Sequence, residues 1–476
     1  MTPSRTSGVY APAYRRLTVG ILFAIVVVAF EAIGVITAMP VVARELDGVQ
    51  FYALAFSAFF TTSLVGMVVA GQLCDRRGPR LPFLVSAAVF ALGLVLAAAA
   101  PSMFVLVVAR AVQGFGGGVN IVAVYVILAR AYPEDLRPQA FTVLSSAWVL
   151  PSIVGPAVAG WLTDEVSWRW VFLAVLPLLV PAVLLVAPRL AALDTVAPSA
   201  ASPPSRSSGR RLSYALAAAS GTALLQYAAQ RLDALSVALG AAGGVLLAVG
   251  LPPLLPPGTL RAGRGLPTTV LLRGVLAGAF FGAETFVPLM LVQERELSTT
   301  LAGFTLTGAA LGWAFGSWFQ GRPALRLPRW LLVRGGALLV TGGIAVLPVA
   351  LLPGVPAGVV AVGWTVAGLG MGLGITTVGV LLLEQSPPAE AGANSAALQV
   401  SDAVGSIVGV GAAGAVFAAL HVGPARDRPV FLVIWVSMAL LAALAAVLAA
   451  RLVPREPAPA DAAGPRAPGV SVGGGH

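Results

Sequence analysis

Long apolar runs dominate the pattern of hydrophobic and polar positions along this chain. Runs of bilayer-spanning length, about 18 residues or more, recur from Leu17 to Leu452 and are separated by short polar loops. The first six lie at 17–43, 51–73, 81–100, 103–129, 139–162 and 171–186. A bilayer is the solvent that suits such runs, so the pattern predicts a bundle of transmembrane helices.

The second part of the chain repeats this pattern after a polar interruption. A stretch rich in Ser, Pro and Arg at 189–211 is typical of a cytoplasmic linker. Two weaker runs follow, at 213–229 and 235–251, and either both span the bilayer or they form an interfacial hairpin. Six more lie at 274–293, 301–319, 335–352, 357–383, 393–420 and 429–452. We therefore expect an all-α integral membrane protein with fourteen transmembrane helices.

These runs predict four regions. They are an N-terminal six-helix half at 1–188, a linker with two extra spans at 189–266, a C-terminal six-helix half at 267–453 and a disordered cytoplasmic tail at 454–476. The first run contains Glu31 and is too long for the core of a cleaved signal peptide, so we expect it to be retained.

Charge refines the orientation and excludes several classes of function. Of the 476 residues, 58% are hydrophobic and 10% are charged, and the net charge is +10. The arginines form small loop clusters instead of one stripe, which favours membrane anchoring over nucleic-acid binding. Most of the 29 basic residues face the cytoplasm if both termini are cytoplasmic, as the positive-inside rule requires. We expect a multi-pass protein of the cytoplasmic membrane.

The residues needed for common catalytic centres are scarce. The chain has no lysine, one cysteine (Cys74) and only His421 and His476 as histidines. A lysine-dependent phosphate loop, a disulfide and a cysteine or histidine metal cluster are therefore not expected. The sequence predicts no cofactor, no metal and no enzyme activity.

An internal repeat relates the two predicted halves. The segment 151–160 recurs at 405–414 with six of ten positions identical, an offset of 254 residues. At the same offset, Gly114, Gly116 and Gly118 fall on Gly368, Gly370 and Gly372, and Glu31 falls within one residue of Glu284. Repeats of this kind are typical of transporters whose two halves surround a central site.

The loop between the second and third runs carries a family signature. Residues 71–80, Gly-Gln-Leu-Cys-Asp-Arg-Arg-Gly-Pro-Arg, resemble the G-x-L-a-D-r-x-G-r-[kr] motif of the major facilitator superfamily. Gly71 would permit close helix contact and Gly78 a tight turn. The resemblance implies a conformational latch made by Gly71, Asp75, Arg76, Gly78 and Arg80.

Two further segments resemble signatures of the same superfamily. Arg110 and Gln113 stand in a segment similar to the fourth-helix motif l-x-x-x-R-x-x-q-G, and Arg within a bilayer is a functional candidate by default. A purely structural Arg is the alternative. Gly155, Pro156 and Gly160 resemble the antiporter signature g-x-x-x-G-P-x-x-G-G and predict a bend that gates, or a packing kink without gating.

Glu31 is the strongest candidate for proton coupling. It precedes Pro40 by nine residues, which resembles the D-x-t-v-x-n-v-A-l-P signature of fourteen-span drug:proton antiporters, and 167–172 is similar to their W-R-W-i-F element. A carboxyl in a low-dielectric cavity can take up a proton from one side and release it on the other. We expect Glu31 to alternate between protonation and substrate, assisted by Arg110; a static hydrogen-bonded carboxyl is the alternative.

The expected substrate cavity combines these groups with two more acids. It contains Glu31, Gln113, Glu284 and Asp402, although Asp402 could instead be purely structural. An excess of acids over Arg110 favours cationic or neutral substrates. The resulting hypothesis is a monomeric multidrug-efflux antiporter that exchanges small lipophilic molecules for protons. The alternatives are an exporter of one endogenous metabolite and a non-transporting sensor or scaffold.

Overall fold

A computed structural model describes residues 8–133, 135–194, 206–229, 234–322, 327–387, 390–423 and 426–453. The predicted tail at 454–476 and residues 195–205 of the predicted linker lie outside these ranges. The first bundle consists of α1 Arg15–Glu45, α2 Tyr52–Arg77, α3 Arg80–Ala98, α4 Met103–Ala131, α5 Arg137–Ser146, α6 Val149–Trp161, α7 Arg169–Leu173 and α8 Leu176–Asp194.

A second bundle and a separate hairpin follow. The hairpin pairs α9 Arg206–Ala228 with α10 Ala234–Gly250. The second bundle consists of α11 Leu266–Glu284, α12 Val287–Glu294, α13 Thr299–Gln320, α14 Arg329–Val346, α15 Gly358–Gln385, α16 Ala391–Leu420 and α17 Arg428–Leu448.

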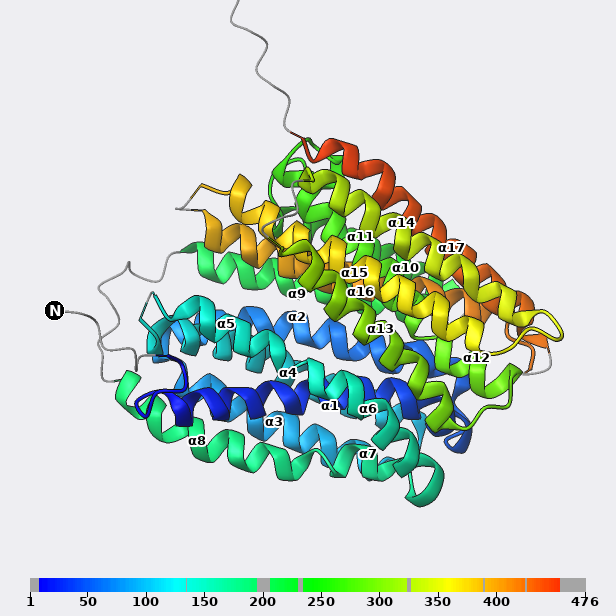
Figure 1. The fold of residues 1–476 in the computed structure, drawn as a ribbon, viewed down its shortest axis with the longest axis horizontal. Helices are drawn as coiled ribbons and strands as arrows, with labels where there is room; N and C mark the ends of the chain where they lie inside the picture. Colours follow the sequence, from blue (N-terminus) through cyan, green and yellow to red (C-terminus); the bar gives the residue numbers. More distant parts are fainter. Residues whose placement is uncertain are drawn as a thin grey trace, which may run out of the picture.

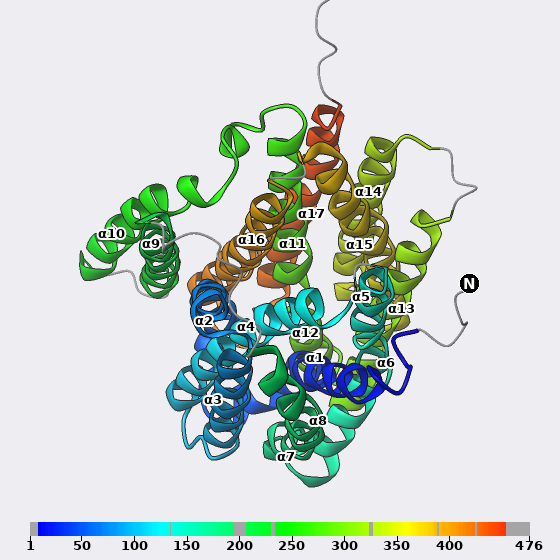
Figure 2. The ribbon, with the colours of Figure 1, turned by 90° about the vertical axis from the view of Figure 1, so that its left-hand side faces the viewer.

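The bundles meet along two seams. One seam is formed by α2 and α16, and the other by α6 and α13. Figure 1 shows the bundles diverging towards the side where the chain begins and converging at the opposite side, near α12. The α9–α10 hairpin lies at the periphery beside α2 and α16 (Figure 2). Any rocking of the bundles must therefore rearrange these two seams.

Matching glycines pack the helices within each bundle. A Cβ at Gly114 or Gly118 of α4 would collide with the backbone of α2. A Cβ at Gly368 or Gly372 of α15 would collide with the backbone of α13. These glycines correspond at the repeat offset of 254, so the sequence repeat is matched by a repeat in packing.

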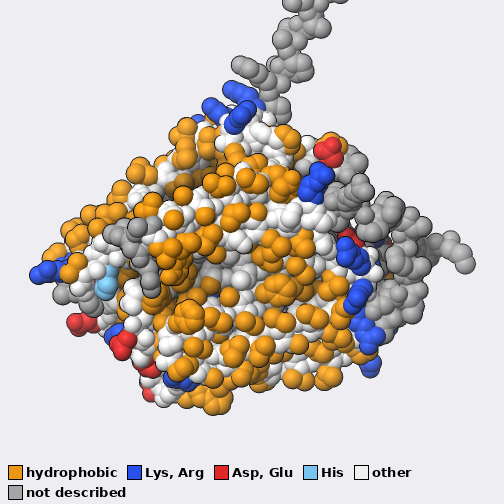
Figure 3. All heavy atoms as spheres, turned by 180° about the vertical axis from the view of Figure 1, so that it is seen from behind, with side chains coloured by type: hydrophobic (Ala, Val, Ile, Leu, Met, Phe, Trp, Pro, Cys, Tyr) orange, Lys and Arg blue, Asp and Glu red, His pale blue; other side chains and the backbone are white. Residues whose placement is uncertain are grey.

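Apolar side chains cover the middle of the molecule. Figure 3 shows a broad hydrophobic band, with arginines along the right-hand edge and acidic and histidine side chains at the left. Twelve helical segments of the described ranges are long and apolar enough to cross a membrane. The chain is a multi-pass membrane protein with twelve candidate spans.

The expected number of fourteen spans is not supported. The difference comes from α9 and α13, which have 23 and 22 residues but are not among the twelve. Polar and small residues explain their lower hydropathy, since three of the first six residues of α9 are arginines and α13 is rich in Thr and Gly.

Three runs that the sequence predicted as continuous helices are broken, one of them being 171–186, which divides between α7 and α8. The 139–162 run divides between α5 and α6, and the 274–293 run divides between α11 and α12. Pro151 and Pro288 stand four residues after Ala147 and Glu284, where the preceding helices stop or turn. Proline has no N–H to bond the carbonyl four residues earlier, so these two breaks have a local cause.

Candidate functional site

Glu31 and Arg110 form a buried ion pair inside the first bundle. Arg110 Nη1 of α4 contacts Glu31 Oε1 of α1. Glu31 has no exposed surface and Arg110 has 3%. Both are charged groups removed from water, and such groups are tolerated only when each has a partner. The structure thus brings together the two residues that the sequence singled out for coupling.

Three more contacts hold the Arg110 guanidinium. Nη1 donates to Gln113 Oε1 at 2.6 Å, one helical turn along α4, and Nε donates to the Ala55 carbonyl at 3.3 Å. The guanidinium also lies 4.5 Å from the centre of the Phe59 ring, within range of a cation–π interaction. Arg110 is therefore bound by α2 and α4 as well as by Glu31.

Gln113 is confined by the neighbouring helix. A Cβ at Gly93 of α3 would lie 2.6 Å from Gln113 Cγ, so only glycine lets α3 approach this closely. Glu31 Oε2 and Gln113 Nε2 are buried and make no hydrogen bond in the part of the chain that the structure describes. One acceptor and one donor thus remain beside the ion pair.

Glu284 lies at the end of α11, next to an aromatic group. Its carboxyl interacts with Trp364 of α15, although Trp364 Nε1 lacks hydrogen-bond geometry to any described residue. Trp364 in turn stacks on Phe280, with ring centres 4.7 Å apart and planes inclined by 17°. Unlike Glu31, Glu284 is partly exposed. It has no ion pair among the described residues.

Asp402 is paired with an arginine that the sequence placed in a loop. Arg273, expected in the cytoplasmic loop before 274–293, lies within α11, and its Nε donates to Asp402 Oδ1 of α16 at 2.5 Å. Their side chains are 20% and 27% exposed. Tyr125 of α4 is close enough to interact electrostatically with both. This second cluster lies between α4, α11 and α16, and its ion pair does not include Glu31 or Arg110.

The loop motif at 71–80 forms a tight turn. Gly78 ends α2 with φ +74°, a conformation that favours glycine. Asp75, Arg76 and Arg80 are exposed, and Asp75 makes no ion pair within the described ranges. The space beside Gly71 is open, so the expected close helix contact there is absent. The latch remains a prediction.

The Gly155, Pro156 and Gly160 segment lies where the bundles touch. Gly155 faces Ile33 of α1, and Pro156 is inside α6. A Cβ at Gly160 would lie 2.7 Å from the backbone nitrogen of Thr300 in α13. These small residues let α6 approach both α1 and the second bundle. Their role as a hinge stays a prediction.

Two residues that sequence reasoning missed also connect the bundles. The Tyr52 hydroxyl donates to the Thr285 carbonyl at 2.8 Å, at the break between α11 and α12. Asp164 accepts hydrogen bonds from the first turn of α13. Pro288 marks the break in the sequence, but no local pattern links it to Tyr52.

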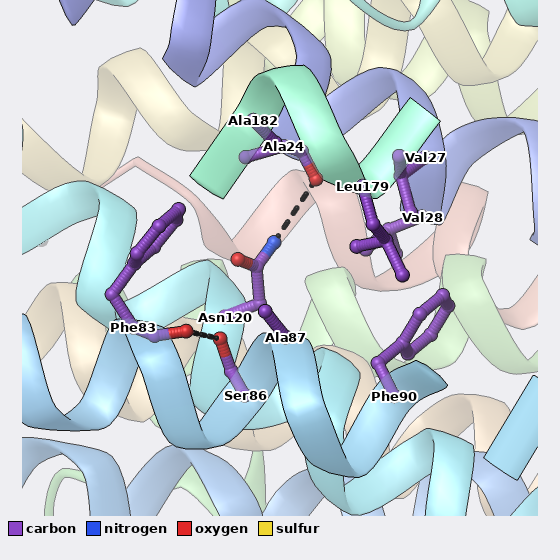
Figure 4. A pocket seen from close by; sticks show the side chains of 10 residues that line it. All are labelled: Ala24, Val27, Val28, Phe83, Ser86, Ala87, Phe90, Asn120, Leu179 and Ala182. Atoms are coloured by element: carbon purple, nitrogen blue, oxygen red, sulfur yellow. Dashed lines mark hydrogen bonds between the residues drawn. The ribbon is translucent and has the colours of Figure 1, made fainter. Parts of the chain in front are cut away.

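A small cavity lined mainly by apolar side chains lies within the first bundle (Figure 4). Asn120 Nδ2 donates to the Ala24 carbonyl at 3.2 Å there, and Ser86 donates to Phe83. Its volume is about 10 Å³, which suits one water molecule. A second pocket of about 210 Å³ lies between α9 and α16. Neither is lined by Glu31, Arg110, Glu284 or Asp402.

A multi-pass helical bundle with ionisable groups inside it defines the class of membrane transporters, not enzymes. Residues 21–409 match the Major Facilitator Superfamily, and the chain belongs to that family. It is 27% identical over 403 residues to a probable multidrug-efflux transporter of Mycobacterium tuberculosis, covering 80% of this chain and 83% of the relative. It is 29% identical to the multidrug transporter protein MdtP of Bacillus subtilis, over 36% of this chain and 32% of that protein.

Solved transporters share the fold. The crystal structure of a POT family transporter in complex with 5-aminolevulinic acid matches with a TM-score of 0.69 at 15% identity, covering 92% of this chain and 97% of that one. The human organic anion transporter MFSD10 matches with a TM-score of 0.59 at 16% identity, covering 92% and 99%. At these identities the likeness concerns the fold alone.

Proposed function

We propose that this protein exports small lipophilic compounds, cationic or neutral, in exchange for protons by alternating access. The buried Glu31–Arg110 ion pair is the observation that carries the proposal. An ionisable pair inside a membrane bundle is expensive to maintain unless it has a function. The efflux names of the bacterial relatives support export as the direction of transport.

Protonation of Glu31 would weaken its ion pair with Arg110. A neutral carboxyl loses its charge attraction to Arg110, and breaking a buried pair is worth about 3–5 kcal/mol. Protonation would favour the conformation in which the pair is apart, and moving a two-state equilibrium from 1:99 to 99:1 takes about 5.5 kcal/mol of such preference. Arg110 would stay bound by Gln113, the Ala55 carbonyl and the Phe59 ring, which lets the cation survive while its partner is neutral.

The substrate would bind between the bundles, near Gln113, Glu284 and Asp402. Unlike Glu31 and Asp402, Glu284 has no ion pair among the described residues, and its partial exposure suits contact with a cationic substrate. Asp402 is already neutralised by Arg273. We therefore place substrate recognition closer to Glu284 than to Asp402.

We also propose the membership and topology that this mechanism requires. The protein would belong to the fourteen-span drug:proton antiporters, with α9 and α13 completing the spans and both termini in the cytoplasm. The boundaries 1–188, 189–266 and 267–453 would separate two moving halves from the peripheral hairpin, in a monomer. The latch at 71–80 and the hinge at 155–160 would act as these halves rock.

Transport by purified protein in liposomes with an imposed pH gradient tests the proposal. We expect wild type to move ethidium, a lipophilic cation, against its gradient. Glu31→Gln should slow proton-driven transport by about 100-fold, the lower end for loss of a proton-carrying side chain. The matched control is Glu165→Gln, at an exposed acid. Full proton-driven transport by Glu31→Gln would reject the coupling role, and a chemically varied panel separates broad from dedicated export.

A further inference from the structure

A carboxylate of the first bundle caps a helix of the second. Asp164 Oδ1 accepts from the Thr299 amide at 3.2 Å, and Oδ2 accepts from the Thr300 amide at 3.0 Å and the Thr300 hydroxyl at 2.7 Å. The first amides of a helix have no partner within it, and its N-terminus attracts negative charge. Asp164 therefore supplies both hydrogen bonds and charge to the start of α13.

The local structure around Asp164 explains why its side chain contacts α13 of the second bundle. It belongs to a π-helical turn, Leu162–Val166, that ends α6. Just before this turn, Gly160 brings the α6 backbone against Thr300, and a Cβ at Gly303 of α13 would lie 2.9 Å from the Pro156 carbonyl. The helices approach at backbone distance because neither side has a Cβ there, so Asp164 needs little length to cap α13.

The other seam has its own cross-bundle bond at the same end of the molecule. Tyr52, at the start of α2, donates to the Thr285 carbonyl at 2.8 Å and is completely buried against Phe286, whose ring centre is 5.6 Å away. Next to it, a Cβ at Gly414 of α16 would collide with Ala53. Both seams are thus closed by a polar bond beside a close glycine contact.

We propose that Asp164 and Tyr52 are positioning residues that hold the outer doorway shut, and that both bonds must break when substrate leaves. This inference rests on transport by alternating access. Each bond is a single cap or hydrogen bond, strong enough to bias two conformations and weak enough to be reversed in every cycle. Thr37, buried and 2.9 Å from the Cβ position of Gly303, lies beneath the α6–α13 contact and should be sealed while the doorway is shut.

Thiol labelling from outside the cell tests this directly. Cys74 is the only cysteine, so Cys74→Ala with Thr37→Cys gives one reporter thiol. In intact cells a membrane-impermeant maleimide should label this reporter slowly. Adding Asp164→Asn should raise the labelling rate about five-fold, because the amide keeps only one accepting oxygen and loses the charge that a helix N-terminus favours. Tyr52→Phe should act in the same direction.

Two controls keep the result decisive. Glu165→Gln changes the adjacent exposed acid and should leave the labelling rate unchanged. Thr300→Val removes only the hydroxyl partner and should give a smaller increase, which serves if Asp164→Asn folds poorly. Unchanged labelling in folded Asp164→Asn and Tyr52→Phe, or an equal increase in Glu165→Gln, would overturn the proposal. Because labelling needs no pH gradient, failure of proton coupling would be seen separately as lost transport with the labelling shift intact.

Discussion

The carboxyls of Glu31 and Glu284 hold matching places in the two bundles, but their neighbours differ in charge. At the repeat offset, Arg110 of the first bundle corresponds to Trp364 of the second. Each acid contacts the residue at this position in its own bundle. Glu31 pairs with Arg110, and Glu284 interacts with Trp364. One acid is sealed and neutralised, whereas the other is partly exposed and has no ion pair among the described residues. The repeated scaffold thus holds two carboxyls in different surroundings.

Replacing the residue that contacts each acid, Arg110 or Trp364, should give the largest difference in protein stability between the two bundles. Arg110→Met keeps much of the side-chain volume but leaves the Glu31 carboxylate buried without its cation, and we expect a loss of about 3–5 kcal/mol in stability. Trp364→Phe keeps the stack on Phe280 and should change stability by much less. Thermal unfolding in detergent at neutral pH measures both.

The double variant Arg110→Met/Glu31→Gln provides the control for this experiment. It should recover most of the stability that Arg110→Met loses, because no buried charge remains, while proton-driven transport stays lost. Equal destabilisation by Arg110→Met and Trp364→Phe would show that the two acids are not held differently.

Substitutions at the equivalent glycines of the two bundles should destabilise the protein equally, unlike substitutions beside the two acids. Gly114→Ala and Gly368→Ala place a methyl against a facing backbone carbonyl, which cannot move aside easily, so each should destabilise by about 1–3 kcal/mol. Gly71→Ala is the control, because its Cβ would meet open space and alanine favours the helix. Thermal unfolding compares the three; tolerance of Gly368→Ala alone would contradict equivalent packing.

A smaller effect should separate the acids by substrate. We expect Glu284→Gln to raise KM for ethidium about ten-fold, equal to ~1.4 kcal/mol, because a cation loses its charge partner. KM for a neutral lipophilic dye should stay unchanged, and the pH gradient should still drive transport. Initial rates in liposomes give both constants. Loss of proton drive in Glu284→Gln would instead assign coupling to the second bundle.

The sequence predicted the helices far better than the contacts between bundles. Apolar run lengths located the spans, and the offset of 254 placed Glu31 within one residue of Glu284 from the sequence alone. The breaks before α6 and α12 were missed because the apolar pattern continues through them, although Pro151 and Pro288 carry the signal. Arg273 was assigned to a loop because charge was read as loop anchoring, whereas Asp402 satisfies it inside the fold.

The contacts of Asp164 and Tyr52 could not be predicted for a different reason. Each joins residues more than 100 positions apart across a seam that we propose to open and close, so the contact would depend on the conformation as well as on the fold. Local propensity and hydropathy carry no information about such a seam. The acids inside each bundle could be predicted because they are tied to helices with a fixed register.

The loops between α6 and α7 and between α16 and α17 extend the comparison and give the smallest expected effect. The last loop of the first bundle is fixed by Trp168 Nε1, which donates to Glu45 Oε2 at 2.7 Å, whereas in the second bundle His421 Nδ1 lies 2.8 Å from both carboxylate oxygens of Asp427. Burial raises the pKa of Asp427, an effect that His421 opposes and the nearby Glu294 reinforces. A raised pKa means that the folded state holds the proton more tightly than the unfolded chain. Asp427 therefore favours folding at low pH and loses that contribution as pH rises above the unfolded value of 3.8 through the raised one.

Asp427→Asn should remove this pH-dependent contribution. The decline of wild-type thermal stability from about pH 4 upwards should be shallower in Asp427→Asn, by at most about 1.36 kcal/mol for each unit by which folding raises the pKa of Asp427. Ser167→Ala serves as the control in the first bundle, because its hydroxyl accepts from the Arg169 amide and neither group titrates in this range, so its unfolding temperature should shift by a similar amount at every pH. If Asp427→Asn instead runs parallel to wild type across the pH range, the charge at this loop does not distinguish the two bundles.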